Sequence, residues 1–200
     1  MKKKLYTLTA LAFVAAVAIV ACTGTTAKEK EKETTAAATP DSAARVARGE
    51  YLVKSVGCDD CHSPKKMGPN GPEIIAELRL SGFQKDGKLP PIDKGTVQKG
   101  WALFAPDLTA AVGPWGISYA ANLTPDETGL ANWKEENFIR AIREGKSKGL
   151  VGNRSLLPPM PWPVYRNMTD EDLKSIFAYL RTVKPVNNAV PNPVAMADVK

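Results

Sequence analysis

The sequence Cys58-Asp59-Asp60-Cys61-His62 constrains this chain more than any other stretch. Two thiols separated by two residues and followed directly by histidine form an attachment sequence for c-type haem. Each thiol adds to one haem vinyl group, and the histidine is then held beneath the iron as its proximal ligand. We therefore predict one covalently bound haem c, attached through Cys58 and Cys61, with His62 as an iron ligand.

Two other chemistries use the same cysteine spacing. A structural zinc site needs about four ligands, and a chain with three Cys and one His has no second cluster to complete it. A thioredoxin-like redox dithiol follows a strand, whereas a helical pattern precedes Cys58. Haem attachment therefore explains the motif better than either alternative.

The first 21 residues are typical of an export signal, with Lys2–Lys4 followed by a largely apolar run at 5–20. The junction at 19–22 (IVAC) resembles the lipobox of bacterial lipoproteins, which implies cleavage before Cys22 and lipidation of its sulfur. An ordinary signal peptide or an uncleaved anchor helix are the alternatives, although the apolar run is short for a span. All three place the folded part outside the cytoplasm, attached to or near a membrane.

Cysteine use and charge agree with this location. Cys58 and Cys61 take the haem and Cys22 takes the lipid, so no thiol is left for a disulfide. Loss of Lys2–Lys4 with the leader lowers the basic residues from 27 to 24 against 21 acidic ones, and the net charge from +6 to +3. Without a basic and aromatic patch, this charge is weak evidence for nucleic-acid binding.

The order of segments predicts one folded domain between appendages. Residues 22–44 form a low-complexity run without large apolar side chains, which favours a disordered tether from lipidated Cys22. Residues 45–186 carry the periodic stretches and the CxxCH motif, and we expect them to form the folded domain. Residues 187–200 follow as a polar, proline-broken C-terminal tail.

The stretch 44–56 is the first of three with helical periodicity, and Gly57 ends it. Gly49 lies between its apolar residues and costs about 1 kcal/mol relative to Ala inside a helix. Close packing of another helix against Gly49 is the expected reason for a glycine there.

The clearest helix begins after Thr169, which is a good N-cap followed by three acidic residues that complement the helix dipole. Pro185 forbids its continuation. An apolar stripe runs along it at i, i+3, i+4 and i+7 spacing: Leu173, Ile176, Phe177 and Leu180. A third helix fits 133–144, with Gly145 at its end and a buried side made of Phe138, Ala141 and Ile142.

A helix with a glycine at its crossing, the CxxCH motif and a late amphipathic helix together resemble the cytochrome c fold. In that family the first and last helices cross beside the haem. We therefore expect an all-α domain with three to five helices around one haem and with long Pro- and Gly-rich loops.

The sixth position of the iron has few candidate ligands. His62 is the only histidine, so a second imidazole is excluded, and methionine, lysine, a free amino terminus or an open position remain. Met1 is lost with the leader, Met196 lies in the tail, and Met67 follows His62 too closely to reach the opposite haem face.

Met160 and Met168 are left. Met168 directly precedes the N-cap Thr169, where a hydrophobic staple residue packs on the helix. Met160 lies in the run LLPPMPWP at 156–163, and proline makes this loop stiff before any ligand binds. A stiff apolar loop suits a weak, neutral thioether ligand, so we predict Met160 as the second axial ligand.

Further motifs extend beyond the general fold. Residues 121–145 contain ANLTPDETGL, then Trp133, then FIRAIREG, and residues 159–181 contain PMPW, MTDEDL and AYLR. These runs are similar to cytochrome c domains of periplasmic alcohol, gluconate and sugar dehydrogenase electron-transfer subunits. The resemblance covers roughly residues 45–186 and implies that Met160 ligates the iron. Those subunits usually hold several haem modules, whereas this chain holds one.

Residues 68–120 have no clean periodicity and no assigned role. Trp115 and Asn122 are candidates for contacting a haem propionate, although plain loop packing is the simpler explanation for each. Six basic residues form either a docking rim for an acidic partner or merely a solvated face: Lys65, Lys66, Arg140, Arg143, Lys146 and Lys148.

Together these features predict a one-electron carrier without catalytic residues, rather than an enzyme. The expected partners are redox proteins, either a dehydrogenase or a terminal oxidase complex, together with the membrane; nucleic acid and small-molecule substrates are not expected. The carrier is either mobile or a fixed subunit of a larger complex. The alternative is a five-coordinate haem with peroxidase or gas-sensing activity, but such sites use a distal His or Arg, and only Arg154 lies near Met160.

Overall fold

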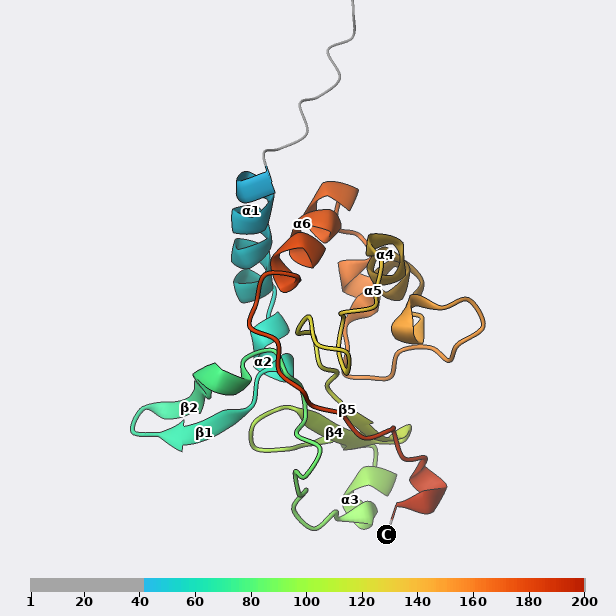
Figure 1. Cartoon of the computed structure of the whole chain (residues 1–200). Helices are drawn as coiled ribbons and strands as arrows, with labels where there is room; N and C mark the ends of the chain where they lie inside the picture. Colours follow the sequence, from blue (N-terminus) through green and yellow to red (C-terminus); the bar gives the residue numbers. More distant parts are fainter. Residues whose placement is uncertain (1–41, 200) are drawn as a thin grey trace, which may run out of the picture. The chain divides into compact units, whose positions relative to one another are not determined.

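The computed structural model describes residues 42–199 (Figure 1). The predicted leader at 1–21, the predicted lipidation site Cys22 and most of the predicted tether lie outside the described residues. Within 42–199, no helix is both long enough and apolar enough to cross a bilayer.

The first and the last long helices of this part pack directly on each other (Figure 1). They are α1 (Ser42–Ser55) and α6 (Asp170–Leu180). A Cβ atom on Gly49 would lie 1.9 Å from the carbonyl oxygen of Ser175 and 2.7 Å from the Cβ of Tyr179. Only a hydrogen fits between the two backbones, so the expected close packing at Gly49 is confirmed.

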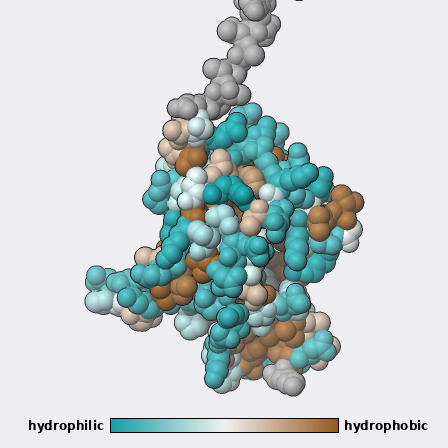
Figure 2. All heavy atoms as spheres, in the orientation of Figure 1, coloured by the Kyte–Doolittle hydropathy of each residue, from teal (hydrophilic) through white to brown (hydrophobic). Residues whose placement is uncertain are grey.

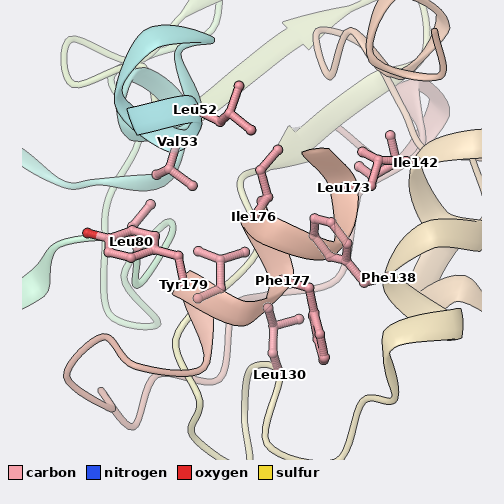
Figure 3. Packing of buried hydrophobic residues seen from close by; sticks show 11 residues of the cluster. Leu52, Val53, Leu80, Leu130, Phe138, Ile142, Leu173, Ile176, Phe177 and Tyr179 are labelled. Atoms are coloured by element: carbon pink, nitrogen blue, oxygen red, sulfur yellow. The ribbon is translucent and has the colours of Figure 1, made fainter. Parts of the chain in front are cut away.

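The apolar stripe of α6 forms the centre of the main core. The hydroxyl of Thr169 accepts a hydrogen bond from the amide of Asp172 at 3.1 Å, which confirms the predicted N-cap. α4 (Glu135–Glu144) covers the other side of α6 and ends at Gly145, as expected. The stripe is buried against α1 and α4 (Figure 3), and the centres of the Phe138 and Phe177 rings are 5.6 Å apart.

Short elements fill the rest of the described chain. They are the helices α2 (Cys58–His62), α3 (Lys94–Gln98) and α5 (Trp162–Tyr165), and the 3-10 turns Ala76–Leu78, Ser147–Gly149 and Met196–Asp198.

The expectation of an all-α domain is wrong. The structure is mixed, with 37% helix, 13% strand and two small antiparallel sheets. The first sheet is the hairpin β1 (Lys65–Gly68) and β2 (Gly71–Ile74). The second has the strand order β3 (Leu103–Phe104), β4 (Ala110–Gly113), β5 (Gly116–Tyr119).

The strands could not be predicted from the sequence because they are short and because β4 is fully buried. Strands of two to four residues are too short for the alternation of apolar and polar residues to be recognised. β4 is buried along its whole length and consists of Ala, Ala, Val and Gly, so it has no alternation at all.

Residues 187–199 pack on the sheet side of the domain, although the sequence sets them apart as a tail. The side chain of Asn188 is buried and donates to the carbonyls of Ser81 and Phe83 at 2.8 and 2.9 Å. Val194 forms a bridge with Ile117. Figure 1 shows this segment running from α6 past β5 to the vicinity of α3. A second apolar cluster lies there, made of Val97, Val112, Ile117 and Val199.

Candidate functional site

The CxxCH sequence forms a short helix of its own, α2. The chain enters it through Gly57, whose φ of 82° lies in the left-handed region that favours glycine. Both cysteines are free thiols and partly exposed, and Cys58 packs against the main core. One tight turn followed by one short helix therefore presents both thiols beside the core formed by α1, α4 and α6.

His62 is held in the protonation state that a metal ligand requires. Its Nδ1 lies 2.7 Å from the carbonyl oxygen of Ala121. A carbonyl can only accept, so Nδ1 carries the proton and Nε2 keeps its lone pair. Burial lowers the pKa of His62, against the opposing effect of the Ala121 bond, so the ring is neutral at pH 7. No hydrogen bond among residues 42–199 uses Nε2. The histidine therefore fits a proximal haem ligand.

The two thiols do not fit a redox-active dithiol. Burial, followed by the charge of Asp59, raises the pKa of Cys58 to about 12. Burial also raises the pKa of Cys61. Reactive CxxC pairs depend on a lowered thiol pKa, so this environment disfavours exchange chemistry.

The zinc alternative finds no support in the described part of the chain. Nowhere in residues 42–199 do three or more His, Cys, Asp or Glu side chains gather in a way that could hold a metal ion.

The loop that carries Met160 is held from several sides. The amide of Leu156 donates to the carbonyl of Gly145 at 2.6 Å, and the hydroxyl of Ser118 donates to the carbonyl of Pro158 at 2.6 Å. Met160 itself is partly buried and packs against the main core, as Cys58 does. The structure thus places α2, the predicted haem-attachment helix, and the Met160 loop on the same apolar cluster.

The other described methionines have different surroundings. Met67 lies on β1 with 75% of its surface exposed, and Met196 packs against the second apolar cluster. Met168 is partly buried against the main core directly before α6, where a staple residue belongs.

Tyr165 was missed by sequence reasoning. It lies at the end of α5, directly after the Met160 loop, and its hydroxyl donates to the carbonyl of Val56 at 2.5 Å. Val56 stands two residues before Cys58, so this bond ties the Met160 segment to the entry of the haem-attachment helix. The two partners are 109 residues apart, and no local pattern could have indicated the contact.

The two residues considered for propionate contacts are engaged by the protein. The buried amide of Asn122 donates to the carbonyl of Val186 at 2.8 Å and to the hydroxyl of Thr128 at 3.1 Å. The indole nitrogen of Trp115 donates to the hydroxyl of Ser118 at 3.2 Å. Packing roles account for both side chains.

A CxxCH helix with a neutral, oriented histidine, set beside crossing terminal helices, defines a c-type haem protein. The cytochrome c family model matches residues 46–184. The chain therefore belongs to the cytochrome c family and binds haem c covalently.

Several relatives are named as subunits of dehydrogenases. The chain is 33% identical over 159 residues to the fructose dehydrogenase cytochrome subunit of Gluconobacter japonicus, covering 78% of this chain and 25% of that protein. It is 32% identical over 160 residues to the gluconate 2-dehydrogenase cytochrome c subunit of Pantoea cypripedii, covering 76% and 28%. A 75-residue stretch is 36% identical to the cytochrome c subunit of alcohol dehydrogenase (quinone) of Gluconobacter oxydans (strain 621H), covering 36% and 15%. The chain spans about a quarter of the first two relatives.

Proposed function

We propose that this chain carries one electron at a time through a haem c that Cys58 and Cys61 attach and that His62 and Met160 ligate. The observation that carries the proposal is the 2.7 Å bond from Nδ1 of His62 to the carbonyl of Ala121. It leaves Nε2 unprotonated and limits rotation of the ring. The bound iron supplies the ferric/ferrous couple, and a thioether ligand raises its potential.

The surroundings of the methionines support Met160 as the second ligand. Met67 is too exposed to serve a buried iron, and Met196 belongs to a different apolar cluster. Met160 shares the main core with Cys58 and lies in a loop with hydrogen bonds to Gly145 and Ser118. A loop held in this way keeps a weak ligand in position without a charged partner.

Visible spectroscopy of the purified holoprotein tests this proposal. We expect a low-spin ferric spectrum with a sulfur-to-iron charge-transfer band and a ferrous spectrum that carbon monoxide leaves unchanged. A high-spin spectrum that shifts at once with carbon monoxide would refute Met160 ligation and favour the five-coordinate alternative. Arg154, the distal candidate of that alternative, is exposed and donates to the carbonyl of its neighbour Ser155.

We also propose that the domain is held at a membrane, outside the cytoplasm, by lipid on Cys22 and a tether at 22–44. The lipobox-like junction and the low-complexity composition support this. Several acyl chains, each contributing about 0.8 kcal/mol per buried CH₂, make such an anchor lasting.

Mass spectrometry of the mature amino terminus tests the lipid anchor: acylated Cys22 is expected, and an unmodified terminus elsewhere would contradict it. Cys22→Ser should release the holoprotein from membranes.

The proposed partner is the catalytic subunit of a dehydrogenase, as the names of the relatives suggest. Of the six basic residues considered for docking, three are used within the domain. Lys65 donates to several backbone carbonyls, including that of Asp107 at 2.9 Å. Arg140 donates to the carbonyl of Gly149 at 3.0 Å, and Arg143 donates to the carboxylate of Asp170 at 2.5 Å. The remaining three are better placed to meet a partner: Lys66, Lys146 and Lys148.

A further inference from the structure

The segment 79–82 lies in the stretch to which sequence analysis assigned no role. It follows the 3-10 turn Ala76–Leu78 and packs against the haem-attachment helix. Nη2 of Arg79 lies 2.6 Å from Oδ2 of Asp59, the residue directly after Cys58. Only 26% of the Arg79 side chain and 11% of the Asp59 side chain are exposed. A pair this shielded depends on both partners being present, because either charge left alone is poorly hydrated.

The same guanidinium also contacts the last helix. Nη1 of Arg79 donates to the hydroxyl of Tyr179 at 2.5 Å, and Tyr179 is a buried residue of α6. Burial opposes the charge of Arg79, but the bonds to Asp59 and Tyr179 raise its pKa above the ordinary value. Arg79 is therefore a permanent cation that joins α2 to α6.

Ser63 extends the network to the end of α2. Its hydroxyl, which is fully buried, donates to Oδ1 of Asp59 at 2.9 Å and accepts from the amide of Leu80 at 2.9 Å. The carboxylate of Asp59 thus has Arg79 on one oxygen and Ser63 on the other. Asp59 and Ser63 are therefore each bonded to a residue of the segment 79–82, Asp59 to Arg79 and Ser63 to Leu80.

Gly82, the last residue of the segment, contacts the backbone of His62. Its amide donates to the carbonyl of His62 at 2.8 Å. A Cβ on Gly82 would lie 2.6 Å from the carbonyl oxygen of Ala121, which is the atom that bonds Nδ1 of His62. The segment therefore contacts α2 at Asp59, at Ser63 and at the backbone of His62.

We propose that the segment 79–82 is a positioning element for the haem, and that Arg79 is its main positioning residue. Arg79 bonds both Asp59 and Tyr179. These two bonds set the orientation of α2 relative to α6, and with it the direction from which His62 would approach the iron. It also neutralises a carboxylate inside the attachment motif. The inference rests on His62 ligation as proposed above.

The test compares holoproteins carrying Arg79→Met, Arg79→Met with Asp59→Asn, and Arg48→Met as a matched control. Arg48 reaches Asp172 of α6 from α1 at 2.9 Å, but its side chain is 49% exposed and far less shielded than Arg79. Two readouts are needed: the midpoint potential, and the haem methyl shifts in proton NMR of the ferric protein, which report the orientation of the axial ligands.

We expect Arg79→Met to lower the potential, because the Asp59 carboxylate left without its partner favours ferric iron. The expected change is at least threefold in the ferric-to-ferrous equilibrium, or about 28 mV for a one-electron couple. The haem methyl shifts should change as well. The double variant, which removes both charges, should return toward the wild-type potential, and Arg48→Met should keep it.

Three results would overturn the inference: an unchanged potential and unchanged methyl shifts in Arg79→Met, an equal shift in Arg48→Met, or a double variant no closer to wild type. If Arg79→Met fails to accumulate as holoprotein, recovery of haem loading in the double variant supports the pairing, and continued failure contradicts it. Failure of the proposed function appears elsewhere, as a wild-type spectrum that is not low-spin.

Discussion

At the scale of single residues, the chemistry of the site depends on how one imidazole is bonded. The carbonyl of Ala121, 59 residues from His62 in the chain, determines which ring nitrogen carries the proton. A ring that donates through Nδ1 and is neutral at pH 7 is the form that ligates a metal. The residue type is thus a property of the motif, whereas its tautomer is a property of the folded chain.

Replacement of Met160 by Ala should open the sixth position. We expect a high-spin ferric spectrum, rapid binding of carbon monoxide to the ferrous form and a lower potential, because a thioether favours ferrous iron. Visible spectra and redox titration measure these changes.

Met168→Ala is the matched control, since Met168 packs against the same core. It should cost about 2–3 kcal/mol of unfolding free energy and leave the spectra as they are. The reverse result, with open coordination only in Met168→Ala, would transfer the ligand role to Met168.

At the scale of elements, the crossing of α1 and α6 depends on the missing side chain at Gly49. The neighbour at this point is the backbone carbonyl of Ser175, which a rotamer change cannot move. Tyr179 follows one helical turn later on α6 and joins it to Arg79. The crossing therefore also determines where the haem-attachment helix is held.

Gly49→Ala should destabilise the domain although Ala is the better helix former. Overpacking costs about 1–3 kcal/mol, and a Cβ 1.9 Å from a carbonyl oxygen belongs at the upper end. We expect a net loss of at least about 2 kcal/mol in urea unfolding after the helix-propensity gain of about 1 kcal/mol is included. Gly95→Ala in α3, whose Cβ would meet only the side chain of Asp93 at 3.2 Å, should change stability by less than about 1 kcal/mol. Equal effects of the two substitutions would contradict the crossing argument.

The ion pair between Arg143 of α4 and Asp170 of α6 should contribute to stability only above acidic pH. The hydrogen bond from Arg143 lowers the pKa of Asp170. Because the pKa of Asp170 is lower in the folded state, the pair stabilises the fold fully at pH values above the unfolded-state pKa of Asp, about 3.9. This stabilisation is lost as the pH falls through the folded-state pKa. Asp170→Asn should therefore lower the Tm slightly at pH 7, since exposed pairs contribute little.

At a pH below the folded-state pKa of Asp170, where its carboxyl is protonated and as uncharged as the Asn variant, the difference in Tm should vanish. Glu171→Gln is the control, because it removes one acid from the same first turn without an Arg143 contact. A difference for Asp170→Asn that persists in acid, or that Glu171→Gln reproduces, would show that the pair is not its cause.

At the scale of the whole molecule, positive charge is concentrated around the Met160 loop. Residues 145–169 contain no acidic residue and four basic ones: Lys146, Lys148, Arg154 and Arg166. At the tip of the loop after α4, Leu150 and Val151 are 47% and 78% exposed. Figure 2 shows apolar surface where this loop projects. The stretch around the proposed ligand therefore combines basic charge with exposed apolar side chains.

Lys146→Gln with Lys148→Gln should slow electron transfer to an anionic acceptor. With ferricyanide in stopped-flow at low ionic strength, we expect about a threefold fall in the rate constant, because these charges attract the anion. The effect should fade as the Debye length shrinks from about 30 Å at 0.01 M salt to about 3 Å at 1 M. Lys88→Gln with Lys99→Gln removes the same charge elsewhere and should leave the rate near wild type. Equal slowing by both pairs would contradict transfer through the Met160 face.

How much could be predicted depended on whether the signal was local. The CxxCH motif, the Thr169 cap and the stripe of α6 lie within a few residues each, and their predictions follow from local spacing. The two sheets gave no such signal, because their strands are short and β4 is buried along its whole length. The partners of the site could not be predicted either, because Arg79, Ala121 and Tyr165 contact it only after folding.

The sequence by itself determined the cofactor and the residues available to bind it, because covalent attachment and ligation depend on residue type and on short spacing. It also determined two crossing helices, through a glycine and a periodic stripe. The tertiary structure decided the mixed fold class, the tautomer of His62 and the network from Asp59 through Arg79 to Tyr179. The strands pair with near neighbours in the chain, but they are too short to leave a periodic pattern in the sequence. The tautomer and the network depend on contacts between residues 20 to 100 positions apart, whose distances arise from packing of the whole chain rather than from any one stretch of it.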